Sequence, residues 1–133
     1  MDRIAEVLFA NEHFYQAFGT GDYQTMESLW AKGVPVTCIH PGHGPLMQRK
    51  EIMKSWKLIL QGESASGLQC KGEEVMIHGD LAWVICYESL QGGYLIATNL
   101  FIQQNGEWKI MHHQAGPTSG RPSENEEISG EIN

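Results

Sequence analysis

Two histidines lie three residues apart in the segment TCIHPGHGP, residues 37–45. A neutral imidazole can accept a proton near pH 7, because its ordinary pKa is about 6.5, and it is also a frequent metal ligand. His40 ends an apolar run that is rich in β-branched residues, and His43 follows it in a loop with prolines and glycines. The segment is therefore compatible with a catalytic base, with a metal site, or with a strand that simply turns into a loop.

A metal site needs more ligands than this loop supplies. Pro41 and Pro45 prevent a helix that would place both histidines on one face, and the loop itself holds no acidic residue. A tetrahedral set would need His112 or His113 from the end of the chain. We therefore expect no metal, and we expect His43 to lie at the rim of a pocket. Phosphate-binding glycine loops and nucleotide-binding fingerprints are absent from the sequence, so we expect no cofactor.

The composition is that of one soluble globular domain. The 133 residues are 41% apolar and 19% charged, which is enough for one hydrophobic core. The net charge of −7 argues against binding to nucleic acid or to anionic membranes, because both select basic surfaces. The opening stretch MDRIAEVLFANEHF has charges inside its apolar part, unlike a signal peptide. Three widely spaced cysteines without a CxxC motif indicate reduced thiols in a cytoplasmic protein.

Helical patterns dominate the first part of the chain. After Asp2, apolar residues recur every three or four positions until a pair of glycines, which predicts a first helix with Asp2 as its cap. Asp22 caps a second, shorter helix. The run VPVTCIH at residues 34–40 predicts a short strand, and QRKEIMKSWKLIL at residues 48–60 predicts a third helix.

Four strand patterns follow, and two-residue turns rich in glycine separate them. They occupy residues 67–80, 81–93, 94–107 and 108–116, and they predict an antiparallel meander. In LAWVICYESL both alternating sets of side chains are apolar, and YLIATNLFI behaves similarly. A sheet that is apolar on both faces needs two covers. The helices supply one, and we predict that a second copy of the chain supplies the other, in a homodimer formed through the sheet.

The end of the chain has a different composition. Residues 118–133 are rich in Ser, Glu, Gly and Pro and contain no apolar run. Such a segment cannot bury enough apolar surface to offset the entropy of ordering it. The sequence therefore predicts one folded domain at residues 1–117 and a disordered acidic tail at residues 118–133.

Four segments together resemble a known family. They are GTGDYQTMESLW, VTCIHPG, QRKEIMKSW and TNLFIQQNGEWKIMHHQAGP. They resemble SnoaL-like proteins of the nuclear transport factor 2-like superfamily, over about residues 5–117. The resemblance implies an α+β cone, in which N-terminal helices pack on a strongly curved antiparallel sheet that encloses a pocket. It leaves the function open, because this scaffold serves isomerases, dehydratases, cyclases, hydrolases, transport adaptors and oligomerisation modules.

The ketosteroid isomerase branch of that superfamily implies a role for His40. That branch places its catalytic carboxylate at the end of the first strand, directly before a proline, where this chain has His40 and Pro41. His40 is therefore the candidate catalytic base. The two oxyanion-binding donors of that branch fall on Phe14, next to Tyr15, and near Thr98, so that the donor pair is not recognisable here.

The same resemblance indicates further pocket residues. Side chains alternate along a strand, so His112 and His113 are predicted on opposite faces, and the alignment favours His113 and Met111 as the inner set. The segment NGEWKIMHHQAG also resembles the end of the association domain of calcium/calmodulin-dependent protein kinase II, where Asn99 replaces an arginine of a polar pocket. The predicted ligand-binding residues are Tyr15, Trp30, His40, Trp56, Thr98, Asn99, Met111 and His113.

The sequence thus predicts a pocket for a small, mainly apolar molecule. Two alternatives stay open: an acid–base enzyme of the isomerase, dehydratase or hydrolase type that uses His40, and an oligomerisation module similar to the kinase association domain. An enzyme requires His40 within hydrogen-bond reach of His113, Asn99 or Thr98 around a closed cavity. An oligomerisation module requires a filled cone and a larger apolar surface on the sheet.

Overall fold

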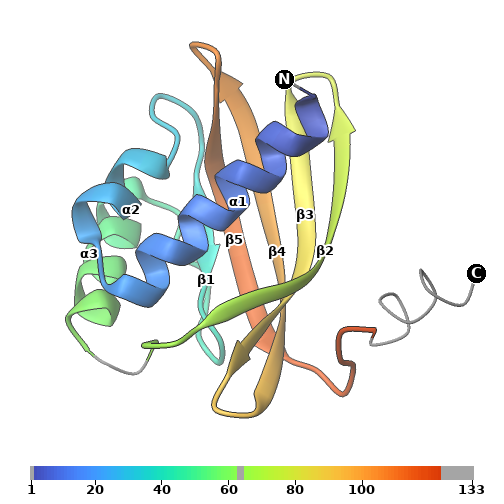
Figure 1. The fold of residues 1–133 in the computed structure, drawn as a ribbon. Coiled ribbons are helices and arrows are strands. Elements are labelled where there is room, and N and C mark those ends of the chain that lie inside the picture. Colours follow the sequence, from blue (N-terminus) through green and yellow to red (C-terminus); the bar gives the residue numbers. More distant parts are fainter. Residues whose placement is uncertain (1, 63–64, 124–133) are drawn as a thin grey trace, which may run out of the picture.

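The computed structural model describes residues 2–62 and 65–123, which form three helices and one five-stranded sheet (Figure 1). No helix within these ranges is long and apolar enough to cross a membrane. The observed order of helices and strands is the predicted order, and it confirms the α+β class. The elements are α1 (Arg3–Thr20), α2 (Tyr23–Leu29), β1 (Thr37–Ile39), α3 (Arg49–Gln61), β2 (Gln69–His78), β3 (Leu81–Leu90), β4 (Gly93–Gln104) and β5 (Glu107–Pro117).

The sheet has the strand order β1-β5-β4-β3-β2. Strands β2 to β5 form the predicted antiparallel meander. Strand β1 joins the far edge parallel to β5, with Cys38 opposite His113, so the sheet is mixed rather than wholly antiparallel. No local turn connects β1 to β5, and for that reason the sequence pattern did not reveal this pairing. The pairing carries the end of β1, and with it His40, to the strand that holds His113.

The two N-terminal helices begin and end where their sequence signals predict. Asp2 accepts a hydrogen bond from the backbone of Ile4 at 3.0 Å, and Asp22 accepts one from the backbone of Thr25 at 3.1 Å. Between them, Gly21 has a φ of +71° and lies so close to α3 that a Cβ there would be 2.9 Å from the carbonyl oxygen of Leu60. Only glycine fits this corner, which holds α1, α2 and α3 together.

All three helices lie on one face of the sheet, and the core fills the space between them (Figure 1). Helix α1 crosses this face diagonally, while α2 and α3 lie on the side of β1. The core residues from the sheet are the inward set of β3 and β4 and the buried residues of β5: Ala82, Val84, Cys86, Ala97, Phe101, Trp108, Ile110 and Ala115. The aromatic residues Phe14, Trp30 and Trp56 join them from the helical layer.

The opposite face of the sheet stays partly exposed in the single chain. Ile85 and Leu81 are 39% and 36% exposed, and Trp83, Tyr87 and Leu100 are half-buried on the same face. This distribution agrees with the apolar pattern predicted for both faces of β3 and β4.

A β-bulge changes the alternation of side chains in β5. Leu100 pairs with His112 and Phe101 pairs with Ile110, which leaves Met111 without a partner. Ile110 and His113 are therefore both buried, whereas Met111 is only half-buried. The prediction of an inner set is confirmed for His113 and wrong for Met111, because simple alternation does not continue through a bulge.

The predicted tail is described only in its first six residues. Gly120 lies against β3, since a Cβ at Gly120 would be 2.8 Å from the hydroxyl of Tyr87. Pro122 lies beside Gly72 of β2, where an added Cβ would be 3.4 Å from the Cβ of Pro122. The rest of the predicted tail, residues 124–133, lies outside the described residues.

Candidate functional site

A cavity of about 460 Å³ lies at the end of the sheet that carries the β3–β4 hairpin. Its wall is mainly apolar and comes from α1, α3, the segment before β2, and the two strands of the hairpin. The polar side chains gather at its base and rim. The lining residues are Phe18, His40, Pro41, His43, Ile59, Ala65, Leu68, Glu88, Leu90, Gly93, Tyr94, Leu95 and His113.

His40 enters the cavity directly after β1. Its Nε2 lies 2.9 Å from the hydroxyl of Ser55, and its ring meets the ring of Trp56 edge to face with centroids 5.0 Å apart. Burial lowers the pKa of His40 below its ordinary 6.5, and the nearby His43 lowers it further. His40 is therefore neutral at pH 7. Its ring centroid is 6.4 Å from that of His113, which is beyond direct hydrogen bonding.

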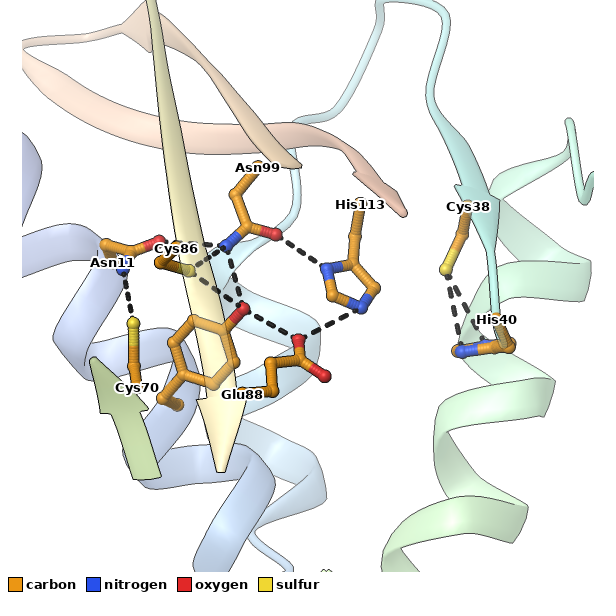
Figure 2. Close-up of polar contacts among 9 residues, drawn as sticks. Asn11, Cys38, His40, Cys70, Cys86, Glu88, Asn99 and His113 are labelled. Atoms are coloured by element: carbon orange, nitrogen blue, oxygen red, sulfur yellow. Dashed lines mark hydrogen bonds and ion pairs between the residues drawn. The ribbon is translucent and has the colours of Figure 1, made fainter. Parts of the chain in front are cut away.

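His113 is 1% exposed and belongs to a buried chain of polar groups (Figure 2). Its Nδ1 lies 2.6 Å from Oδ1 of Asn99, and Asn99 donates in turn to Oδ1 of Asn11 at 2.9 Å and to the hydroxyl of Tyr15 at 3.1 Å. Burial lowers the pKa of His113 to about 3, with smaller contributions from His40 and His112. This chain holds a neutral imidazole in one orientation at the base of the cavity.

Glu88 is the second buried polar group at the base. It comes from the inward set of β3 and is only 3% exposed. The hydroxyl of Tyr15 donates to its Oε2 at 2.7 Å, and Nε2 of His113 lies 3.8 Å from the same oxygen. Burial raises the pKa of Glu88 to about 7, although the bond from Tyr15 opposes the shift. The base of the cavity thus contains a carboxyl group that stays protonated at mildly acidic pH.

Cys38 and Cys70 do not have the properties of nucleophiles. Burial raises the pKa of Cys38 to about 12, so its proximity to His40 yields no thiolate. Cys86 lies 3.4 Å from the hydroxyl of Tyr15, and Cys70 receives a bond from Asn11 at 3.4 Å. The hydrogen bond with Cys86 and burial raise the pKa of Cys70 well above its ordinary value. All three cysteines are unpaired.

The structure brings together five of the predicted ligand-binding residues. His40 and His113 line the cavity, Tyr15 and Asn99 lie directly behind its base, and Trp56 supports the ring of His40. The other three lie elsewhere: Trp30 pairs with Ile110 beside α2, Thr98 is half-buried on the outer face of the sheet, and Met111 occupies the bulge. His43 lines the cavity as well.

Sequence reasoning missed Glu88 and Asn11. Both carried a detectable signal, because each is a polar residue at a position that the periodicity assigns to the core. Glu88 continues the inward set Ala82, Val84 and Cys86, and Asn11 lies on the apolar face of α1. A carboxylate or amide at such a position is rare unless it has a specific partner.

Metal ligands do not converge in this site. Within the described residues, no three His, Cys, Asp or Glu side chains are arranged to hold a metal ion. The base of the apolar cavity holds a carboxyl group with a pKa near neutrality beside two neutral imidazoles. These groups can form hydrogen bonds and transfer protons.

A family model and two solved structures similar to this chain agree on one family. The SnoaL-like domain family matches residues 7–118. A proposed dehydratase of the NTF2-like family from Streptomyces avermitilis is 32% identical, with a TM-score of 0.78 over 89% of this chain and 97% of that protein. A proposed calcium/calmodulin-dependent protein kinase type II association domain from Thiobacillus denitrificans is 25% identical, with a TM-score of 0.74 over 83% of this chain and 93% of that one.

A third relative is a longer protein. The F-box protein SKIP8 of Arabidopsis thaliana is 29% identical over 111 residues, which are 82% of this chain and 48% of that protein. The chain therefore spans about half the length of this curated relative. From the extent of the family match and the agreement of the folds, the chain belongs to the SnoaL-like family of the nuclear transport factor 2-like superfamily.

Proposed function

We propose that this protein binds a small, mainly apolar molecule inside the cone, with the polar end of the molecule at the base formed by Glu88, His113 and His40. The observation that carries the proposal is the distribution of polar and apolar side chains in the cavity: the wall is mainly apolar, while His113 lies beside both Glu88 and His40. A volume of about 460 Å³ is within the usual range for small-molecule sites.

Filling the cavity tests this proposal. Leu95 lines the cavity from β4, so Leu95→Trp is expected to reduce the affinity for 2-naphthol, a compact apolar probe, by at least about tenfold, because the indole occupies the space of the probe. Isothermal titration calorimetry measures the affinity. Leu58→Trp is the matched control, since Leu58 is 64% exposed on α3. Equal affinities for the two variants would contradict binding in the cone.

Acid–base catalysis is the second candidate function, although His40 makes no direct hydrogen bond to His113 of the kind that the sequence led us to expect of an enzyme. It is favoured by Glu88, whose carboxyl has a pKa near 7 in the same cavity as the neutral imidazole of His40. The 32% identity to a proposed dehydratase supports the same class of reaction. In this mechanism His40 removes a proton from the carbon next to a carbonyl group, and Glu88 donates a proton to the carbonyl oxygen, which gives the enol.

Exchange of a ketone's α-protons with deuterated water tests the acid–base candidate. With 2-tetralone as the probe, we expect the protein to accelerate the exchange seen by NMR, and we expect His40→Ala to lose about 10²-fold of that acceleration. His78→Ala is the control, because His78 is exposed at the end of β2. Exchange at the rate of buffer alone, or an equal loss in both variants, would exclude His40 as the base.

We also propose that two copies associate through the outer face of the sheet, where Trp83, Ile85 and Leu100 lie partly exposed. Static light scattering at micromolar concentration is expected to give twice the chain mass of 14.9 kDa. Ile85→Glu is expected to give single chains, because it places a charge within this apolar face. A wild-type protein with the mass of one chain would refute the dimer.

A further inference from the structure

The hydrogen bonds around Asn99 determine the tautomer of His113. Asn99 uses both hydrogens of its side-chain amide, one toward Asn11 and one toward Tyr15. Its oxygen therefore faces Nδ1 of His113 at 2.6 Å, and a carbonyl oxygen only accepts. Nδ1 must carry the hydrogen of the neutral ring, which leaves Nε2 as an acceptor without a hydrogen.

The acceptor of His113 faces Glu88 without bonding to it. Nε2 of His113 and Oε2 of Glu88 are 3.8 Å apart, which exceeds the length of a hydrogen bond. Oε2 already accepts from Tyr15 at 2.7 Å, so a proton on Glu88 resides on Oε1, for which no bond to a described residue is found. Figure 2 shows the ring of His113 between Asn99 and Glu88. An acceptor and a carboxyl group thus stand side by side at the base of the cavity.

His40 has the opposite tautomer. The hydroxyl of Ser55 donates its one hydrogen to the carbonyl oxygen of Ile52 at 2.7 Å, so it must accept from Nε2 of His40 at 2.9 Å. This bond holds the neutral ring of His40 in place at the base of the cavity. Neither lysine nor arginine is among the described residues that line the cavity. An anionic ligand would therefore meet carboxyl and imidazole groups without any fixed positive charge to pair with it.

We infer that the base of the cavity binds the hydroxyl group of an uncharged alcohol or phenol, with Glu88 donating a hydrogen bond to the hydroxyl oxygen and Nε2 of His113 accepting the hydroxyl hydrogen. A hydroxyl group is at once acceptor and donor, and it satisfies both side chains. A carbonyl group satisfies Glu88 alone, and a methyl group leaves both buried polar groups without partners. The inference rests on the proposed function, because it names the ligand class of the same cavity.

Four compounds that share a naphthalene ring system distinguish a hydroxyl ligand from an apolar or a charged one at pH 6.0. They are 2-naphthol, 2-methylnaphthalene, 2-naphthoate and 2-(aminomethyl)naphthalene, which present a hydroxyl, a methyl, an anion and a cation. We expect 2-naphthol to bind about tenfold more tightly than 2-methylnaphthalene, as one net hydrogen bond in a buried site allows, and more tightly than either charged compound. Titration calorimetry or quenching of tryptophan fluorescence gives the affinities.

Variants of two glutamates test whether Glu88 causes the preference for the hydroxyl compound. Glu88→Met is expected to lower the ratio of 2-naphthol to 2-methylnaphthalene affinity by about threefold, because only the bond to Nε2 of His113 remains, while Glu74→Met, at an exposed position of β2, keeps the wild-type ratio. Circular dichroism checks that both variants are folded, and the wild-type ratio decides the matter if Glu88→Met is not. Equal wild-type binding of the hydroxyl and methyl compounds, or tightest binding of a charged one, overturns the inference but leaves the proposed function intact. No binding of any of the four overturns both.

Discussion

Glu88→Gln is expected to raise the free energy of unfolding by about 3 kcal/mol at pH 8.5 and by less than about 0.5 kcal/mol at pH 4.5. Burial raises the pKa of Glu88 from 4.5 in the unfolded chain to about 7 in the folded one. Between these values the folded state binds more protons than the unfolded state, so this carboxyl lowers stability as the pH rises from 4.5 through 7. Glutamine resembles the protonated acid and has no such dependence.

Urea denaturation of the wild type and the variant at the two pH values measures this difference. Glu74→Gln is the control, because Glu74 is exposed on the neighbouring strand. The pKa of His113 is lowered to about 3 in the folded protein, so the free energy of unfolding decreases as the pH falls below 6.5. This decrease occurs in the wild type and in the variant alike, and it largely cancels when the two are compared. A variant that is less stable than the wild type at pH 8.5 would mean that Glu88 is ionised and paired with a charged His113.

Asn99→Ala is expected to lower the free energy of unfolding by about 4 kcal/mol. Asn99 is fully buried, and its side chain bonds to Asn11, Tyr15 and His113. Truncation leaves Oδ1 of Asn11 and Nδ1 of His113 in the core without partners, and each orphaned buried group costs about 1–3 kcal/mol. Chemical denaturation followed by circular dichroism measures the loss.

Thr98→Ala is the matched control for this substitution, since it deletes the neighbouring side chain from the outer face of the same strand. We expect it to change stability by less than about 1 kcal/mol. A loss below about 1 kcal/mol for Asn99→Ala as well would show that the buried chain of polar groups is not a stabilising unit.

The order of elements could be predicted from the sequence because its signals are local. Asp2 and Asp22 cap helices, and glycine-containing turns separate strands whose side chains alternate. The parallel pairing of β1 with β5 and the bulge at Met111 could not be predicted in the same way. Both depend on contacts between distant segments, which periodicity does not report.

The candidate site was predictable in part for the same reason. His40 and His113 were placed in the cavity by the strands that carry them, and the family resemblance gave their direction. Glu88 was missed because its strand reads as an apolar core strand, and the partner that makes its burial tolerable, Tyr15, comes from α1. Thr98 and Asn99 were both assigned to the pocket by sequence position, but the alternation along β4 turns only Asn99 inward.

Binding of a small, mainly apolar molecule inside the cone can be followed at two glycine amides in the ¹H–¹⁵N NMR spectrum during titration with 2-naphthol. Gly93 lines the cavity, and Gly106 lies in the β4–β5 turn, outside the cavity lining. We expect the Gly93 resonance to shift and saturate while that of Gly106 stays in place. A stationary Gly93 at saturating probe, or equal shifts of both amides, would contradict binding inside the cone.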